Sequence, residues 1–246
     1  MLRKTTLVAV TAVVLASCVW LANAQQPSTA AVPITGEQHH HLIFQNDYVR
    51  VFNVIVPAGD ATLLHRHNFP YLYLSLGPAN FANAVEGQPE ARVSLQDNDT
   101  RYSAGHMSHL VRMDKGLPFH NITIELLRPQ ENLVNIGAEV APNVPKRSAD
   151  ALSADTSGEA ALTHLFATSE LQLGLVELRA GVPYVEANAK HPALLIVRNG
   201  ANVLSKVASN PPKTLRPGEV EWLPSAAKRS LTATADASVL VVSFLD

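Results

Sequence analysis

Histidine is unevenly distributed along this chain of 246 residues, and its distribution points to chemistry. Eight of the ten histidines fall in the first half, and two of them form the pair His65-x-His67. Positions i and i+2 of a β-strand project from the same face, so the two imidazoles are expected to lie side by side. Neutral imidazole is the commonest metal ligand in proteins. The pair therefore predicts a metal site that a third ligand from a neighbouring strand completes.

Two stretches around these histidines resemble the two sequence motifs of the cupin superfamily. In Gly59–Gly77, five residues separate the first glycine from the His-x-His pair, and a strand pattern then runs to the second glycine. In Ala104–His109, an Ala-Gly step stands three residues before a further histidine. In cupins, two histidines and a glutamate from the first motif and one histidine from the second hold a divalent metal inside a small β-barrel.

Carried over residue by residue, the resemblance implies that His65, His67 and His109 bind one divalent transition metal. The three ligands do not choose among Fe, Mn, Zn, Ni and Cu. The competing interpretation is a degenerate barrel whose histidines merely form internal hydrogen bonds. The run His39-His40-His41 is expected to be a solvated stretch, with a contribution at the barrel mouth as the alternative.

The chain departs from the cupin pattern in two places. The glutamate position falls at Tyr71 or Leu72, so the first motif lacks its carboxylate, and Met113 stands where the second motif often has asparagine. Tyr71 and Tyr73 share strand parity and are expected to face the same side. If that side is the interior, Tyr71 is the candidate catalytic residue, as a donor, a weak ligand or a plain wall. Tyr71, Tyr73 and Met113 then form the candidate substrate pocket.

The elements that must position these side chains read as strands. Short apolar runs rich in Val, Ile, Leu and Tyr alternate with Gly, Pro, Asn and Asp, which is typical of an all-β protein. Helical periodicity is scarce, and Ser148–Leu165 is the best helical candidate. The expected strands are Tyr48–Val56, Tyr71–Leu76, Asn121–Leu127, Leu171–Leu178, Leu194–Val197 and Val239–Leu245.

The two halves of the chain resemble each other. Asp47–Gly59 and Ser169–Gly181 both combine an acidic start, an apolar strand and a final Ala-Gly. Self-similarity of this kind indicates two copies of one β-domain. With the cupin resemblance, it predicts two tandem jelly-roll β-barrels. The expected divisions are a signal peptide (1–24), a flexible tether (25–38), an N-terminal barrel with the metal site (39–128), a linker with some helix (129–163) and a degenerate C-terminal barrel (164–246).

The second copy lacks the ligands. Ala187 and Ala189 stand at the positions that match the histidine pair, Ala193 falls near the glutamate position, and Arg229 matches His109. Any chemistry is therefore assigned to the N-terminal barrel. The C-terminal barrel is expected to supply packing, an interface or a binding surface.

The first 24 residues have the pattern of an export signal. Arg3 and Lys4 precede the apolar run Leu7–Leu21, and Ala22-Asn23-Ala24 supplies small residues for cleavage. The apolar run is shorter than the roughly 20 residues that span a bilayer, so no membrane span is expected after processing. The pattern predicts a periplasmic or secreted bacterial protein. The alternative is a lipoprotein anchored at Cys18.

Composition narrows the function further. The formal net charge of −2 argues against a nucleic-acid partner, and a single cysteine excludes a disulfide scaffold. The resemblance implies metal-dependent, oxygenase-like or isomerase-like chemistry on a small-molecule substrate. The alternatives are a non-catalytic bicupin of the cell envelope that binds a ligand or a metal, and a structural or partner-binding protein with an incidental metal. Whether the protein forms a homodimer stays open.

Overall fold

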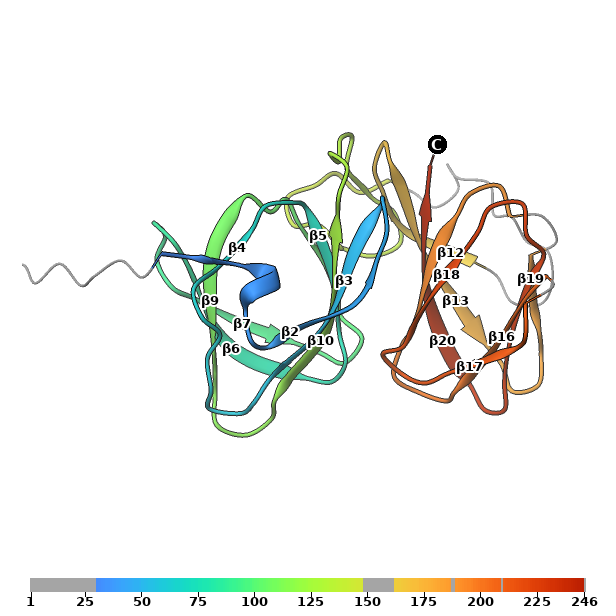
Figure 1. Cartoon of the computed structure of the whole chain (residues 1–246), viewed down its shortest axis with the longest axis horizontal. Helices are drawn as coiled ribbons and strands as arrows, with labels where there is room; N and C mark the ends of the chain where they lie inside the picture. The colour runs from blue at the N-terminus through green and yellow to red at the C-terminus, as the bar shows by residue number, and fades with distance from the viewer. Residues whose placement is uncertain (1–29, 148–161, 187–188, 209, 246) are drawn as a thin grey trace, which may run out of the picture.

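Strands make up nearly all of the regular structure in this chain. The computed structural model describes residues 30–147, 162–186, 189–208 and 210–245. Within these ranges the only helical element is the three-residue 3-10 turn η1 (Ile34–Gly36). No described helix has the length and apolar character needed to cross a membrane. The expected all-β class is confirmed, and Figure 1 shows the strands gathered into two barrels side by side.

The first barrel consists of two five-stranded sheets. One sheet has the order β1-β4-β9-β6-β7 and the other β2-β3-β10-β5-β8. The strands are β1 (Val32–Pro33), β2 (His40–Gln45), β3 (Val49–Val56), β4 (His65–His67), β5 (Tyr71–Ser75), β6 (Ala79–Val85), β7 (Ala91–Leu95), β8 (Thr100–Ser103), β9 (Met107–Met113) and β10 (Phe119–Leu126).

The second barrel pairs a six-stranded sheet with a four-stranded one. Their orders are β11-β12-β13-β20-β15-β18 and β14-β19-β16-β17. The strands are β11 (Val134–Asn135), β12 (Leu162–Ala167), β13 (Leu171–Leu178), β14 (Tyr184–Glu186), β15 (Ala193–Val197), β16 (Val203–Val207), β17 (Lys213–Leu215), β18 (Val220–Leu223), β19 (Arg229–Ala233) and β20 (Ala237–Phe244).

The internal repeat is visible strand by strand. β3 and β13 have the same length and the same sequence of buried, half-buried and exposed positions. β10 lies between β3 and β5 in the first barrel, as β20 lies between β13 and β15 in the second. The loops after β3 and β13 turn on Gly59 and Gly181, whose φ angles are 76° and 75°. The six strands expected from the sequence are all present, with ends that move by one or two residues.

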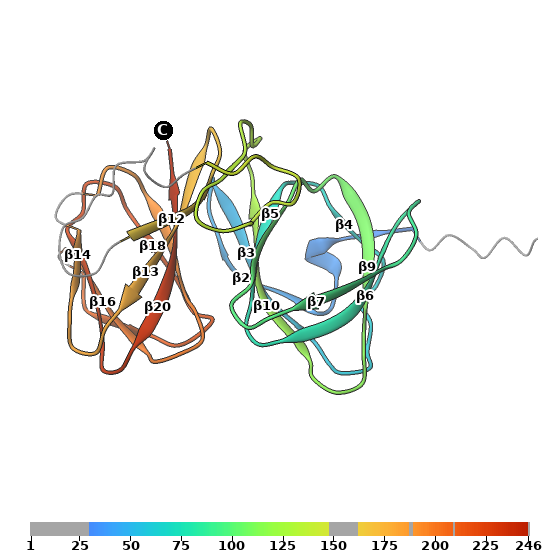
Figure 2. The ribbon, with the colours of Figure 1, turned by 180° about the vertical axis from the view of Figure 1, so that it is seen from behind.

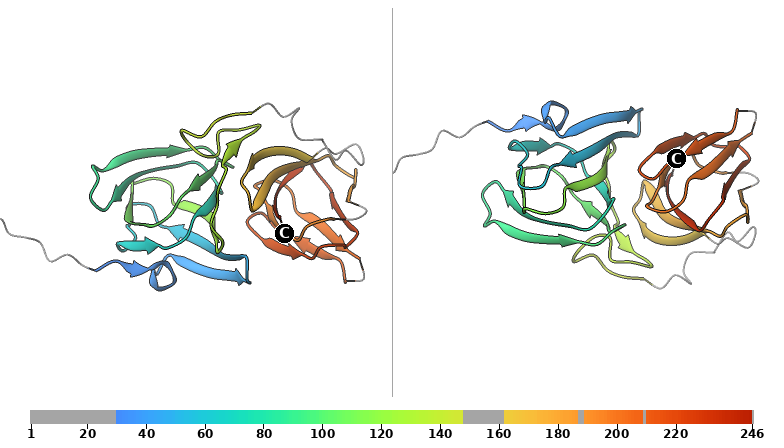
Figure 3. Two further views of the ribbon diagram at one scale, coloured as in Figure 1. Left: turned by 90° about the horizontal axis from the view of Figure 1, so that it is seen from above. Right: turned by 90° about the horizontal axis from the view of Figure 1, so that it is seen from below.

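The main apolar core lies between the barrels, and this decides which side chains face inward. On β5, Leu72 and Leu74 are buried in the cluster shared with the second barrel, whereas the alternating residues Tyr71 and Tyr73 line the interior of the first. Figure 2 and Figure 3 show the β3-β10-β5 sheet and the β13-β20-β15 sheet adjacent in views from behind, above and below. The faces of β5 and β10 that point towards the second barrel are therefore apolar. The alternating residues Asn121 and Thr123 of β10, like Tyr71 and Tyr73 of β5, carry polar groups and line the interior of the first barrel.

Aromatic and apolar side chains make contacts between the two barrels. The Trp222 ring lies 6.0 Å from Phe44, 5.4 Å from Tyr48 and 5.4 Å from Phe244, measured between centroids. Trp222 is therefore partly buried against the core between the barrels. Gly218 approaches Leu76 of the first barrel so closely that a Cβ there would lie 2.8 Å from its Cδ1 atom.

The segment expected to be a flexible tether is part of the first barrel from residue 32 onward. Val32 and Pro33 pair in parallel with β4 opposite His65 and Arg66. Ile34 is buried in the barrel core, because an apolar side chain at this position closes the end of the sandwich. The expected signal peptide and residues 25–29 lie outside the described residues.

The expected linker also differs from its prediction. Residues 148–161 lie outside the described residues, and Leu162–Leu165, the end of the expected helix, belongs to strand β12. Earlier in the same stretch, β11 adds a two-residue edge to the sheet of the second barrel. The Asn135 side chain holds the following loop by accepting from the Val140 and Ala141 amides and donating to the Ala141 carbonyl. A short edge strand and an asparagine-centred loop carry no apolar periodicity that a sequence pattern could detect.

Candidate metal centre

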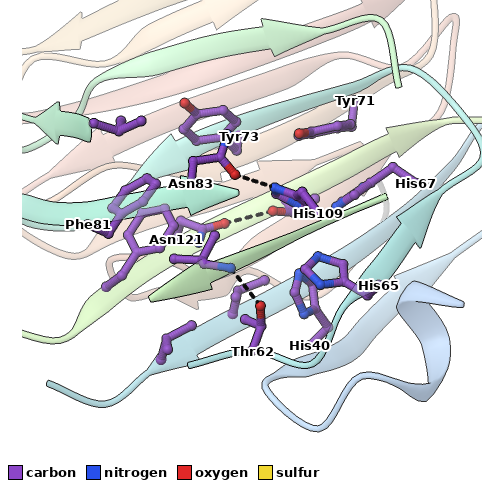
Figure 4. Close-up of a pocket in the computed structure, with 16 residues that line it drawn as sticks. His40, Thr62, His65, His67, Tyr71, Tyr73, Phe81, Asn83, His109 and Asn121 are labelled. Atoms are coloured by element: carbon purple, nitrogen blue, oxygen red, sulfur yellow. Dashed lines mark hydrogen bonds between the residues drawn. The ribbon is translucent and has the colours of Figure 1, made fainter. Parts of the chain in front are cut away.

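Four histidines converge inside the first barrel. His65 and His67 lie on β4, His109 lies directly opposite His65 on β9, and His40 is the first residue of β2. The His65 ring centroid is 5.1 Å from that of His67, 4.5 Å from His109 and 4.7 Å from His40. Figure 4 shows the four rings gathered at one end of a pocket. Two adjacent strands and the N-terminal segment thus supply one cluster of imidazoles.

A close backbone approach brings the two histidine-bearing strands together. The loop before β9 turns at Gly105, whose φ is +68°, and passes so near to Phe69 that a Cβ on Gly105 would lie 1.9 Å from the Phe69 carbonyl oxygen. Glycine fits here because it has no Cβ and because it adopts positive φ angles without steric strain. The Ala-Gly step of the second motif therefore sets the β4–β9 register in which His65 faces His109.

Oxygen acceptors outside the cluster hold three of the rings. The Nδ1 atom of His40 lies 2.5 Å from Glu37 Oε2, that of His65 lies 2.9 Å from the Leu63 carbonyl oxygen, and that of His109 lies 2.7 Å from Asn83 Oδ1. Each acceptor requires the proton on Nδ1, so Nε2 of each ring presents its lone pair to the cluster. This is the arrangement by which proteins orient metal-binding histidines.

Three buried imidazole nitrogens have no hydrogen-bond partner among the residues that the structure describes. They are Nε2 of His65, Nε2 of His109 and Nδ1 of His67, the last of which lies 4.0 Å from Glu125 Oε1. One ligand atom each from His40, His65 and His67 can be chosen so that all three lie within 4.8 Å of one another. Unpaired buried nitrogens are costly, and a cation that accepts their lone pairs removes the cost. The donor set therefore fits a transition metal with nitrogen ligands, whose bonds are about 2.0–2.1 Å long.

Burial keeps these imidazoles neutral. Burial, and after it the charge of His40, lowers the pKa of His65 to about 4. Burial, and after it the charges of His65 and His40, lowers the pKa of His109 to about 3. Burial and the neighbouring histidines lower the pKa of His67 as well. The neutral form is the one that binds metals. At neutral pH the cluster is therefore ready to coordinate.

The cluster opens into a cavity of about 80 Å³ in the same barrel. The four histidines form one end, Tyr71 and Tyr73 form part of a wall, and Phe81 lies at the other end (Figure 4). The remaining lining residues are Val54, Val56, Thr62, Asn83, Val93, Val111, Phe119, Asn121 and Thr123. The site is thus a small chamber with nitrogen donors at one end and apolar groups at the other.

Comparison with known proteins rests on structure alone, since no family model and no curated protein matches the sequence. A cupin 2 conserved barrel protein from Leptotrichia buccalis superposes with a TM-score of 0.52 at 12% identity, over 84% of this chain and 88% of its own. A salicylate 1,2-dioxygenase from Pseudaminobacter salicylatoxidans has a TM-score of 0.55 at 13% identity, over 80% of this chain and 71% of its own. The chain has the two-barrel cupin fold.

A third similar structure is an oxalate decarboxylase from Bacillus subtilis whose Mn(II) centres have been characterised. It has a TM-score of 0.53 at 10% identity, over 80% of this chain and 69% of that one. At these identities the likeness establishes the fold alone, and the chemistry of this chain must be argued from the chain's own residues.

A buried carboxylate lies beside the histidine cluster, although it does not come from the first motif. Glu125 on β10 pairs with Tyr71 on β5, and its Oε1 lies 4.0 Å from His67 Nδ1. Arg50 holds the other oxygen at 2.7 Å. Burial raises the pKa of Glu125, and Arg50 opposes the rise. Glu125 does not line the cavity, and its place beside His67 follows from the pairing of β10 with β5, which no spacing within the motif indicates.

Tyr71 and Tyr73 line the cavity together, on the shared face that strand parity predicted, whereas Met113, placed in the pocket by the motif resemblance, does not line it. The Tyr71 ring stacks on His67 with centroids 4.2 Å apart, and burial raises its pKa to about 12. Burial raises the pKa of Tyr73 too. Met113 packs in the apolar cluster of the barrel with Phe81, to which it is paired, and is absent from the residues that line the cavity. Its place at the end of β9 points its side chain into the packed end of the sandwich.

Sequence reasoning missed Glu37 and gave His40 a place at the site only as the alternative. The run His39-His40-His41 was expected to be solvated, with a contribution at the barrel mouth as the other possibility, and the structure places His40 in the cluster and leaves only His41 of the three exposed. Burial alone would raise the pKa of Glu37, but His40 and the amides of His39 and Leu63 outweigh it and hold the pKa at about 2. The sequence signal is Glu37-x-x-His40 ahead of the first long strand. Its meaning depends on where the fold carries that segment.

An ion pair replaces the cluster in the second barrel. Arg229 on β19 is paired with Glu186 on β14, and its Nε atom lies 3.0 Å from Glu186 Oε2. Arg229 also donates to the His191 carbonyl oxygen at 3.0 Å. Ala189 and Ala193 are buried, and Ala187 lies outside the described residues. In the described part of this barrel, no three His, Cys, Asp or Glu side chains gather as they do in the first.

Proposed function

We propose that the first barrel of the bicupin binds one divalent transition metal through His65, His67 and His109 with His40, and performs oxygenase-like chemistry there on a small molecule. The observation that carries the proposal is the gathering of buried imidazoles in the first barrel, where one nitrogen each of His65, His67 and His109 has no hydrogen-bond partner among the described residues. A bound metal would supply a Lewis acid and, if it is redox-active, a site for dioxygen. Nitrogen donors suit Fe, Ni, Cu and Zn, and the metal is left to measurement.

The chain's own residues define what a substrate meets. Glu37, Leu63 and Asn83 orient the imidazoles, so the donor atoms are in place before binding. Tyr71 is a neutral phenol against His67 and can donate a hydrogen bond to a substrate oxygen. Apolar walls keep bulk water from the reacting end.

Elemental analysis tests the metal. Untagged protein prepared without chelators, and protein reconstituted with each metal under nitrogen, should hold close to one metal per chain. The double substitution His65→Ala/His67→Ala should abolish the stoichiometric metal, and His41→Ala, an exposed neighbour, should retain it. Metal content that is undiminished in the double variant would refute the assignment. Oxygen consumption that depends on the metal and a substrate would then establish the oxygenase chemistry.

The second candidate is a bicupin that binds a ligand or metal without turnover. The observation in its favour is that His65, His109 and Tyr71 have pKa values of about 4, 3 and 12, so these three lining groups supply no acid or base near neutral pH. Tight binding of a small molecule that is recovered unchanged would support this candidate over the oxygenase.

Export belongs to the same proposal. We propose that the bicupin is periplasmic or secreted after cleavage at Ala24, with anchoring at Cys18 as the alternative. Mass spectrometry of the mature N-terminus separates the two, because a diacylglyceryl cysteine would replace the free chain start at Gln25.

A further inference from the structure

We infer that the ligand of the first barrel has one metal-chelating head and an uncharged, compact, apolar body. The inference rests on the proposed metal site and adds the class of molecule to it. It comes from three observations: the charge of the cavity lining, the chemistry of the far end and the size of the cavity.

The cavity wall carries no permanent charge. None of its sixteen lining residues is Lys, Arg, Asp or Glu. Arg50 and Glu125 pair with each other at 2.7 Å, and neither residue lines the cavity. A charged group on the body of a ligand would therefore be buried without a partner, which is strongly unfavourable.

The end of the cavity away from the histidines is apolar. Phe81 lies at this end (Figure 4), its ring stacks on that of Phe119 with centroids 4.7 Å apart, and Val93 is paired with Phe81. The polar side chains on the rest of the wall are uncharged apart from the histidines, and Asn121 already accepts a hydrogen bond from Thr123 through its carbonyl oxygen. A ligand body that fills the apolar end must therefore be largely hydrocarbon to match the wall.

The cavity is small. One water molecule needs about 10–15 Å³ of the cavity volume that the centre of a water-sized sphere can reach. The cavity's volume of about 80 Å³ therefore corresponds to roughly five to eight water positions. A ligand with a head and a body of about nine non-hydrogen atoms in all is therefore near the upper limit.

Two hydroxamates of matched shape test the inference. 4-Methylpentanohydroxamate ends in an isopropyl group, and the monohydroxamate of succinic acid has a carboxylate in its place. Both are titrated into the cobalt(II)-loaded full chain, and binding is followed through the visible absorption of the cobalt. The neutral-bodied hydroxamate should bind at least tenfold more tightly. The substitution Val93→Arg, at a half-buried wall position, should reverse or narrow the preference, and Val93→Leu should preserve it.

The outcomes separate this inference from the proposed function. Equal affinities, a preference for the carboxylate, or no binding of either compound to protein that holds cobalt would overturn the inference and leave the metal site standing. Protein that takes up no cobalt, or takes up as much in the His65→Ala/His67→Ala variant, would overturn the proposed function itself.

Discussion

The residues around the histidine cluster differ in what they do for it. His65 and His67 share a strand, and His109 faces them across one pair of strands. Glu37, although it does not line the cavity, is fully buried at the back of His40, and its second oxygen accepts from the Leu63 amide. Glu37 thus connects the N-terminal segment to the loop that carries His65. Its role is to position ligands rather than to contact a substrate.

Removal of the Glu37 charge tests this role. Glu37→Gln should lower metal affinity about 10- to 100-fold, because an amide holds the His40 imidazole less firmly and makes it a weaker donor. Competition with a chromophoric chelator measures the change, and Glu131→Gln, an exposed glutamate, serves as the matched control. Equal affinities of Glu37→Gln and the parent chain would show that His40 is not a ligand.

Acid should destabilise the metal-free protein in a defined window. The pKa values of His65 and His109 are about 4 and 3 in the folded chain, against about 6.5 in an unfolded one, so the unfolded state binds more protons between these limits. Stability should therefore fall as pH falls from about 6.5 towards 4, with His65 alone accounting for roughly 3 kcal/mol. Urea unfolding of the metal-free chain at pH 7 and pH 5 measures the loss. A His65→Ala/His109→Ala chain should show a distinctly weaker dependence, and an identical dependence would contradict the assignment.

At the scale of elements, three separate segments build the site. β4 carries two histidines, β9 carries one, and the N-terminal segment from β1 to β2 carries the fourth with its glutamate. The parallel pairing of β1 with β4 places this segment over the histidine strand. The loop at Gly105 then holds β9 against the turn that follows β4. Small errors in either connection would move imidazoles apart.

Gly105 is the sharpest test at this scale. Gly105→Ala should destabilise the fold by about 3 kcal/mol or more and lower metal affinity, because the new Cβ meets the Phe69 backbone and the residue must keep a positive φ. Gly87 has a similar φ of +77° but open space around it. The substitution Gly87→Ala therefore measures the cost of the positive φ alone, about 1 kcal/mol. Urea unfolding and chelator competition measure both variants. Equal losses in the two would rule out the close approach as the cause.

At the scale of the whole molecule, the barrels share their largest apolar core. Residues of β5 and β10 meet those of β13, β15 and β20 there, and Trp222 joins aromatic rings from both sides. Hydrogen bonds from Asn199 to Asp97 and Asn98 add a polar contact at the edge. The second barrel therefore acts as a support for the sheet whose inner face lines the cavity.

Truncation of Trp222 tests the dependence of one barrel on the other. Trp222→Ala should cost about 2–4 kcal/mol and should split a single calorimetric transition into two, because the shared core no longer couples the barrels. Trp222→Phe, which keeps a ring in the cluster, should lose less and keep one transition. A parent chain that already unfolds in two steps would show that the shared core does not couple the barrels.

The sequence by itself determined the strand pattern, the repeat and the histidine motif. Alternation of apolar residues and the recurrence of Ala-Gly after β3 and β13 are local properties, so they can be recognised without a fold. The same holds for His65 and His67, which any strand would place on one face. The loss of ligands at Ala189 and Arg229 was equally open to comparison of the two halves.

Only the tertiary structure decided how the interior is composed. Parity showed that Tyr71 and Tyr73 share a face, but the core between the barrels, by burying Leu72 and Leu74, assigned that face to the cavity. Three residues reach the cluster from strands or loops that are distant in sequence: His40, Glu37 and Glu125. Met113, at the end of β9, packs in the apolar cluster of the barrel and does not line the cavity. Contacts of this kind depend on sheet order and on packing between sheets. Neither quantity is encoded in the spacing of residues along one strand.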